Sequence, residues 1–265
     1  MAYEAEFVRY ELDGHVATIT MNRPERLNAF GEQTADELGG AWLEAMGDDD
    51  VRCVILTGEG RVFCAGRDIR EQRELEGRQR RSDGRVAASR ADVLGFFHVP
   101  ETDKPIIAAV RGGAWGAGWF MCCGSDIVVA AADARFAMSH LPTGIIGPAF
   151  VPILNNLPWL PGSEIVLRGH QVSAERAHAL GLVNHVVPAD AVLSTARDLA
   201  EEIAGLPPVH VQVTKQQLMM ARRRPATYQF DIAFPQAFQG LMTLEDTREA
   251  AAAFAERRTP VFRGR

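Results

Sequence analysis

The sequence lacks the features of membrane-spanning, secreted and nucleic-acid-binding proteins. No segment holds 18 consecutive apolar residues, and Met1 to Arg9 lacks the basic-then-apolar pattern of a secretory signal. Basic residues are not in excess either, because 28 Lys and Arg stand against 34 Asp and Glu, a formal net charge of −6. This balance argues against nucleic acid or an anionic membrane as the main partner. We therefore expect a cytoplasmic protein that binds neither.

Cysteine is scarce, and its spacing excludes the common cysteine-based sites. The four cysteines are Cys53, Cys64, Cys122 and Cys123. Two of them are adjacent and none forms a Cys-x-x-Cys pair, so the sequence predicts neither a zinc site nor a disulfide framework. We expect buried free thiols in a reducing compartment, and no bound metal.

The length of 265 residues predicts one large domain, or a domain with a small appendage. Alternating apolar residues indicate a β-hairpin of Phe7–Leu12 and His15–Met21 that turns at Asp13-Gly14. An apolar stripe of helical period predicts a helix over Gln33–Met46, and an apolar run predicts a strand over Val51–Thr57.

The stretch Lys104–Asp126 combines a predicted strand, a glycine-rich turn and a predicted helix, and the predictions for the site are built on it. An apolar strand, Ile106–Val110, leads into a glycine-rich turn and then into a helical run, Trp119–Cys123. The first N–H groups of a helix lack intrahelical acceptors, and together with the helix dipole they suit an anion or a developing oxyanion. The alternative is a tight crossover whose glycines serve packing alone. The glycines of the turn are Gly112, Gly113, Gly116 and Gly118.

The glycine turn does not match a nucleotide-binding fingerprint. Its spacing is G-x-x-G-x-G, the reverse of the dinucleotide motif, and no Gly-Lys-Ser/Thr follows as in a P-loop. An oxidoreductase with a nicotinamide cofactor is therefore not favoured. A second glycine-bearing element, Phe63–Ile69, follows the predicted strand Val51–Thr57. Two such strand-to-loop junctions can offer two backbone N–H groups to one carbonyl oxygen, the arrangement of an oxyanion hole.

The C-terminal half continues with short strands and then with helices. Strands are expected over Ile127–Ala131 and Arg135–Met138, and the proline-bearing segment Gly144–Pro161 is expected to be irregular. Ser173 is the predicted N-cap of a short helix that ends at Gly181. A last strand, Asn184–Val187, precedes three helical patterns: Ala191–Ala204, Val209–Arg223 and Leu244–Arg257.

Five motifs in this order resemble the crotonase superfamily, the enoyl-CoA hydratase/isomerase family. The resemblance implies an α/β (α+β) fold in which ββα units form a spiral core over 1–188. It further implies a C-terminal helical region over 189–265 that builds a homotrimer or a dimer of trimers. The motifs are Asn22–Ala29, Phe63–Ile69, Lys104–Asp126, Ser173–Ala177 with Gly181–Val183, and Arg257–Phe262.

The resemblance also implies a ligand and the residues that bind it. The family binds acyl-CoA thioesters and holds the thioester oxygen between two backbone N–H groups. Carried over by position, these donors are the N–H groups of Arg67 and Ala117. Coenzyme A is then part of the substrate, and no further cofactor is implied. The other implied substrate-binding residues are Glu25, Arg26, Leu27, Ala65, Asp68, Gly116 and Phe120.

The sequence departs from the family at the acid/base positions. A typical hydratase of the family uses two glutamates, which activate a water molecule and deliver a proton across the double bond. Phe120 and His140 stand at those two positions here. Phenylalanine cannot move a proton, whereas histidine, with an ordinary pKa of about 6.5, can. His140 is thus the predicted catalytic side chain, and His98 is a second candidate.

Two classes of function follow from this departure. The first is an enoyl-CoA hydratase-type lyase of fatty acid metabolism, or a family isomerase or hydrolase, that uses His140. The second is an acyl-CoA-binding protein that keeps the fold and the oxyanion hole without hydratase activity. Phe120 favours an apolar pocket and hence the second class, while His140 favours the first.

Overall fold

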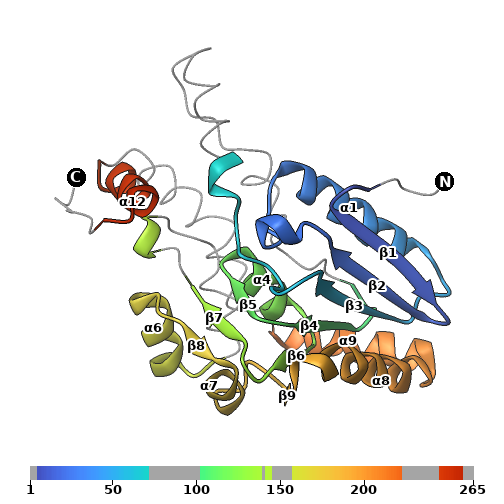
Figure 1. Cartoon of the computed structure of the whole chain (residues 1–265). Coiled ribbons are helices and arrows are strands. Elements are labelled where there is room, and N and C mark those ends of the chain that lie inside the picture. The colour runs from blue at the N-terminus through green and yellow to red at the C-terminus, as the bar shows by residue number, and fades with distance from the viewer. Residues whose placement is uncertain (1–4, 72–101, 139–140, 145–156, 223–244, 259–265) are drawn as a thin grey trace.

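The computed structural model describes residues 5–71, 102–138, 141–144, 157–222 and 245–258. These residues form a mixed α/β fold with two sheets, and the helices α8 and α9, which follow β9, lie along one side of the larger sheet (Figure 1). The predicted α/β class is therefore confirmed. Among the helices of these ranges, none combines the length and the hydrophobicity needed to span a bilayer.

Six strands form the main sheet in the order β1-β2-β3-β4-β6-β9. β1 and β2 are antiparallel, with Val8 opposite Met21, and each later strand pairs in parallel with its neighbour. Parallel strands require cover on both faces, and every residue of β3 and β4 is buried. The strands are β1 Val8–Asp13, β2 Val16–Met21, β3 Cys53–Gly58, β4 Ile106–Val110, β6 Ile127–Ala131 and β9 His185–Val187.

A smaller sheet has the order β5-β7-β8. β5 (Gly113–Trp115) pairs in parallel with β7 (Arg135–Ala137), and β8 (Val172–Ser173) pairs with β7 in antiparallel. β4 of the main sheet is separated from β5 of the small sheet by two residues only. The predicted glycine turn is therefore the point where the chain crosses from one sheet to the other.

Two helices cover much of the main sheet. α1 (Glu32–Gly47) lies beside β1 and β2 and buries Leu38 and Trp42. α8 (Val192–Ala204) packs on β3, β4 and β6 through alanines spaced one helical turn apart. The remaining helices are η1 Pro24–Arg26, α4 Ala117–Gly124, η2 Leu141–Thr143, α6 Trp159–Arg168, α7 Ala174–Ala179, η3 Ala189–Ala191, α9 Pro208–Arg222 and α12 Glu245–Glu256.

Buried lysines attach α9 and α1 to the two ends of the stretch Lys104–Asp126. Lys215 Nζ of α9 lies 2.7 Å from Asp126 Oδ2 and donates to the Lys104 carbonyl oxygen at 2.6 Å. Lys104 Nζ donates in turn to the carbonyl oxygens of Ala45 and Asp48 at 2.8 and 2.5 Å. Burial lowers the pKa of Lys104, and the two carbonyl oxygens compensate part of this desolvation. Both ends of the glycine stretch are thereby fixed.

Most predicted elements are found close to their expected bounds. β4 has the predicted bounds, the hairpin turns at Asp13-Gly14, and Ser173 caps α7 by accepting the Arg176 N–H. Residues 145–156 of the predicted irregular segment Gly144–Pro161 lie outside the described residues; the prediction was wrong at the end of the segment, because α6 begins at Trp159. Pro161 lies in the first turn of α6, where its missing N–H costs no intrahelical hydrogen bond.

The division into 1–188 and 189–265 stays a prediction. Beyond Pro188 the described residues form helices only. However, α8 packs directly on the main sheet and shares its hydrophobic core, so the first of these helices is not a separate appendage.

Candidate functional site

The two glycine-bearing segments predicted to form the site lie side by side. Cys64 and Ala114 form a parallel bridge, in which Cys64 N–H donates to the Gly113 carbonyl oxygen at 3.3 Å. Trp115 N–H donates back to the Cys64 carbonyl oxygen at 3.0 Å. A Cβ atom on Gly118 would lie 2.6 Å from that same oxygen, so only glycine lets α4 approach this closely.

Gly66 brings the second loop against the start of α4. Its φ is +92°, a conformation that favours glycine. A Cβ atom there would lie 2.8 Å from the Trp115 carbonyl oxygen and 3.6 Å from Gly116 Cα. Gly66 directly precedes Arg67, and Gly116 directly precedes Ala117. The backbones that carry both predicted oxyanion donors are therefore in contact.

The Ala117 N–H is the first of helix α4. Gly116, the N-cap, accepts hydrogen bonds from the N–H groups of Trp119 and Phe120 at 3.1 and 3.2 Å, and its own N–H donates to Ala137. As the first N–H group of α4, the N–H of Ala117 has no acceptor within the helix. This is the expected state of a first-turn donor, and with the helix dipole it favours negative charge at this point.

Arg67 is held in place by pairing with Phe30. In this parallel bridge the Phe30 N–H donates to the Gly66 carbonyl oxygen at 2.7 Å, and the Asp68 N–H donates to the Phe30 carbonyl oxygen at 3.0 Å. The bridge thus uses the carbonyl group of Gly66 and the N–H group of Asp68, which lie on either side of Arg67 in the chain. The direction of that N–H is set by the pairing and does not depend on the arginine side chain.

The segment that precedes Phe30 is locked by Asn28. Leu27 and Asn28 both have φ of +54°, which is uncommon for residues other than glycine. Asn28 is fully buried; its Oδ1 accepts the Arg23 N–H, and its Nδ2 donates to the carbonyl oxygens of Glu59 and Val62. These bonds offset the backbone strain and join the loop after β2 to the loop after β3.

The implied substrate-binding residues are brought together but are not equivalent. The Ala65 N–H donates to the Leu27 carbonyl oxygen at 2.9 Å, so the segments Glu25–Leu27 and Ala65–Asp68 adjoin. Glu25 is exposed, whereas Arg26, Leu27 and Ala65 are half-buried and available to a ligand.

Asp68 is occupied within the protein. Its buried carboxylate accepts the N–H groups of Arg70 and Glu71 and forms an ion pair with Arg23 at 3.2 Å. Arg23 also lies 4.7 Å above the centroid of the Phe7 ring. These contacts favour a role for Asp68 in holding the loop, and its predicted contact with the ligand stays a prediction.

Phe120 lies in an apolar environment. It is 3% exposed, and its neighbour Trp119 packs edge-on against Phe136 with the ring centroids 5.5 Å apart. Such a side chain supplies shape and no proton. His140 and His98 lie outside the described residues, and within the described ranges no group of three or more His, Cys, Asp or Glu is arranged to hold a metal ion.

All four cysteines are buried and free, as predicted. Burial raises the pKa of Cys53 and Cys64 to about 12 and the pKa of Cys122 well above its ordinary value. Cys64 adjoins the loop of the candidate site, and Cys122 lies one turn of α4 beyond Gly118. Thiols in this state are weak nucleophiles, and we assign them to the core.

We predict that the thiols make unfolding easier at high pH. In the folded protein they stay protonated up to about pH 12, whereas the unfolded chain loses these protons above about pH 9. The free energy of unfolding should therefore be unaffected by them below pH 9 and should fall by about 1 kcal/mol or more per thiol by pH 10. Urea titrations at pH 8 and pH 10 measure this difference.

Cys53→Ala is the control for the thiol prediction, because it removes one titrating group from the same core. It should reduce the loss of stability between pH 8 and pH 10 by the contribution of one thiol. An identical loss in both proteins, or alkylation of the folded protein by iodoacetamide at pH 8, would contradict the prediction.

Comparisons with known proteins point to a single family. A sequence model of the enoyl-CoA hydratase/isomerase family matches residues 11–265. The chain is 34% identical to 1,2-epoxyphenylacetyl-CoA isomerase of Escherichia coli (strain K12), with 98% of this chain and 99% of that protein covered. It is 32% identical to (E)-benzylidenesuccinyl-CoA hydratase of Thauera aromatica, with 97% and 99% covered.

The solved structures lead to the same family. A carnitinyl-CoA hydratase from Mycobacterium avium superimposes with a TM-score of 0.83 at 33% identity, and the match covers 98% of this chain and 99% of that one. The expected crotonase-like fold is thereby confirmed. The chain belongs to the enoyl-CoA hydratase/isomerase family, the crotonase superfamily.

Proposed function

We propose that this protein binds an acyl-CoA thioester and stabilises its enolate or oxyanion with the backbone N–H groups of Arg67 and Ala117. The observation that carries the proposal is the contact of Gly66 with Trp115 and Gly116, which joins the two donor-bearing backbones. Preorganised donors of this kind are aimed at the charge that develops in the transition state. Coenzyme A enters as part of the substrate, and the proposal needs no other cofactor.

The donors are independent of side chains, and this supports ligand binding despite the unusual residues nearby. Arg67 is positioned by its backbone pairing with Phe30, and Ala117 by the N-cap geometry of Gly116. Replacement of a catalytic glutamate by Phe120 leaves both arrangements intact. Leu27, Arg26 and Ala65 adjoin the Arg67 loop and are proposed to contact the CoA moiety.

For the reaction, we propose a hydratase/isomerase-type conversion in which His140 transfers the proton. Phe120 cannot share a water molecule with a second carboxylate, so addition of water to crotonyl-CoA should be very slow. An isomerisation needs enolate stabilisation and a single acid/base group, which His140 supplies. The name of one relative, an isomerase of an epoxyphenylacetyl-CoA, is in line with this choice.

The second candidate is an acyl-CoA-binding protein without catalytic activity. The burial of Phe120 at 3% exposure, beside Trp119 at 2%, favours it, because an apolar wall selects a ligand by shape without acting on it. The two candidates differ in one respect only, which is whether a bound acyl-CoA is converted.

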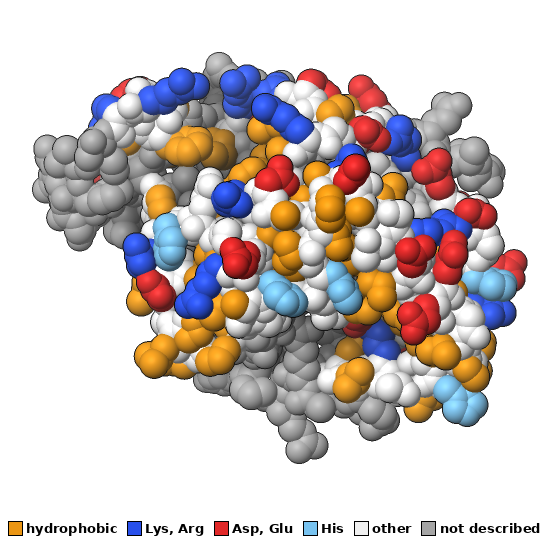
Figure 2. Space-filling model, turned by 60° about the horizontal axis from the view of Figure 1, so that its bottom comes forward, with side chains coloured by type: hydrophobic (Ala, Val, Ile, Leu, Met, Phe, Trp, Pro, Cys, Tyr) orange, Lys and Arg blue, Asp and Glu red, His pale blue; other side chains and the backbone are white. Residues whose placement is uncertain are grey.

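We further propose that the chain assembles as a homotrimer or a dimer of trimers in the cytoplasm. Large apolar side chains are exposed on three of its helices, and Figure 2 shows such side chains interspersed with charged ones on one face. Leu244, predicted as part of the apolar stripe of α12, lies outside the described residues. The exposed large apolar residues are Trp159, Leu160 and Leu167 on α6, Val209, Val213 and Leu218 on α9, and Phe254 on α12.

Light scattering tests the proposed assembly. A mass near 29.0 kDa, that of a single chain, would contradict it.

Ala117→Pro tests the oxyanion hole. Proline is tolerated at the first position of a helix but has no N–H, so the substitution removes one donor and retains α4. Loss of such a donor typically lowers kcat by about 100- to 1,000-fold. We expect weaker binding of an acyl-CoA and unchanged binding of free CoA, measured by isothermal titration calorimetry.

The matched control for this variant is Ala117→Gly, which keeps the N–H and should bind both ligands like the native protein. Equal losses for acyl-CoA and CoA in the proline variant would argue against the assigned donor. Thermal unfolding of both variants reports whether the fold is retained.

The substitution His140→Ala distinguishes between the two candidate functions, an enzyme and a binding protein without catalytic activity. A panel of acyl-CoA thioesters is incubated with the native protein, and conversion and binding are read by mass spectrometry. If the native protein converts a thioester, the variant should lose that conversion by at least about 100-fold, the usual contribution of an acid/base group, and should keep the affinity. His98→Ala is measured in parallel because His98 is the second candidate, and it should retain activity if His140 transfers the proton. Undiminished turnover in His140→Ala would remove this residue from the mechanism.

A further inference from the structure

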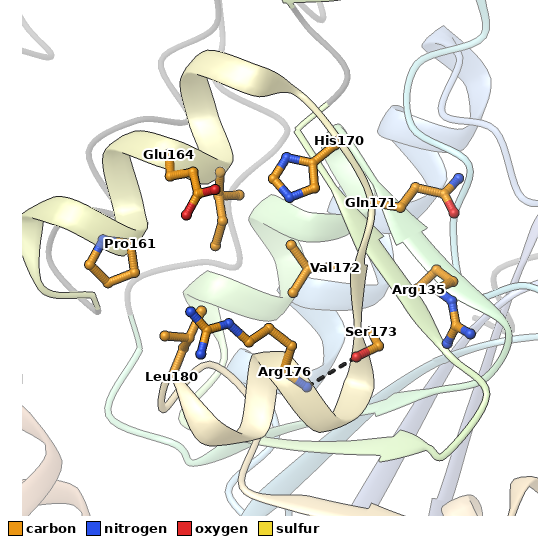
Figure 3. Close-up of a pocket in the computed structure, with 10 residues that line it drawn as sticks. Arg135, Pro161, Glu164, His170, Gln171, Val172, Ser173, Arg176 and Leu180 are labelled. Atoms are coloured by element: carbon orange, nitrogen blue, oxygen red, sulfur yellow. Dashed lines mark hydrogen bonds between the residues drawn. The ribbon is translucent and has the colours of Figure 1, made fainter.

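A pocket of about 460 Å³ lies in the small sheet region, between α6, β8 and α7 (Figure 3). Its volume is within the range of about 300–1,000 Å³ that is usual for small-molecule sites. Arg135, at the start of β7, lines the pocket, whereas Ala137, at the end of β7, accepts the Gly116 N–H of the candidate active site. The pocket and the proposed oxyanion hole are thus at opposite ends of one strand.

Three apolar side chains form part of the wall of the pocket, among lining residues that are mostly polar. Ile165 of α6 and Val172 of β8 are 3% and 4% exposed, and Leu180 at the end of α7 closes one side. Of the three, Leu180 is half-buried and supplies most of the apolar surface that a short hydrocarbon body can pack against, with Ile165 and Val172 behind it. An inorganic ion would leave this surface unused.

The charged side chains around the pocket have a positive balance. Arg176 of α7 lines it; its backbone N–H is used by the cap on Ser173, and its guanidinium extends along the pocket in Figure 3. Glu164 is the acidic lining residue, and Arg168 pairs with it at 2.5 Å from one turn further along α6. The Arg135 guanidinium donates to the carbonyl oxygens of Asp133 and Ala134 and adds a second lining cation.

His170 adds a hydrogen-bond donor. Its Nδ1 is buried and has no hydrogen-bond partner among the described residues. A neutral imidazole carries one proton, and a buried N–H without an acceptor is more costly than an unused acceptor. The proton therefore belongs on Nε2. Figure 3 shows the ring between Glu164 and Val172 with a nitrogen turned into the pocket.

We propose that this pocket binds a small organic carboxylate, with the carboxylate group on Arg176 and His170 Nε2–H and the hydrocarbon body on Ile165, Val172 and Leu180. Both donors are complementary to acceptor oxygens, and the charge of Glu164 is balanced by Arg168. The site is separate from the proposed thioester site, so its occupancy does not depend on the proposed function.

Hexanoate and hexylammonium are suitable probes, because they share a hydrocarbon body and differ in the sign of charge. With histidine labelled by ¹⁵N, hexanoate should shift the His170 imidazole resonances saturably, with a Kd on the order of 1 mM or below. Hexylammonium should not, and inorganic phosphate, which lacks a hydrocarbon body, should bind at least tenfold more weakly. Saturating CoA should leave the hexanoate shifts in place.

Arg176→Ala should weaken hexanoate at least tenfold, and His170→Phe, which keeps a ring of similar size, should weaken it too. Arg9→Ala is the control; it removes the same charge from exposed β1 and should have no effect. The proposal is overturned if hexylammonium binds as well as hexanoate, if Arg176→Ala and Arg9→Ala behave alike, or if CoA displaces the probe. No saturable shift up to 20-fold above the expected Kd, about 20 mM, would overturn it as well.

Discussion

The structure of the candidate site depends on the close approach of two backbones at Gly66 and Gly116. A side chain on Gly66 would collide with the Trp115 carbonyl oxygen, and one on Gly118 would collide with the Cys64 carbonyl oxygen. Because neither is present, the loop after β3 lies directly against the start of α4. The bridge between Cys64 and Ala114 fixes the register of this contact. The backbones that carry the two proposed donors, Arg67 and Ala117, thereby adjoin.

The surrounding elements keep this approach in place. Asn28 joins the loops that follow β2 and β3, and Asp68 holds the Arg67 loop through Arg23 and the backbone of Arg70. At the other end of the chain, Lys215 of α9 binds Asp126, two residues beyond the end of α4. The C-terminal helices therefore contribute to the site by fixing the stretch that carries Ala117.

The sequence allowed a good prediction of the main sheet and of the donor-bearing loops. Short apolar runs that contain β-branched residues, such as Ile106–Val110, favour a buried strand, and the glycines mark where backbones approach. The strand β5 was not predicted, because Gly113–Trp115 pairs with β7 and with Cys64, which are both distant in sequence. Its residues give no local signal. The internal role of Asp68 was likewise hidden, since it depends on Arg23, which is 45 residues away in the chain.

The central claim is that a thioester carbonyl oxygen accepts hydrogen bonds from the backbone of Arg67 and Ala117. Infrared difference spectroscopy with an acyl-CoA labelled by ¹³C at the thioester carbonyl tests it most directly. Two donors polarise the carbonyl, so its stretching frequency should fall on binding, and the shift should shrink in a variant that lacks the Ala117 N–H. A bound thioester whose carbonyl frequency equals that of the free ligand in water would contradict the account.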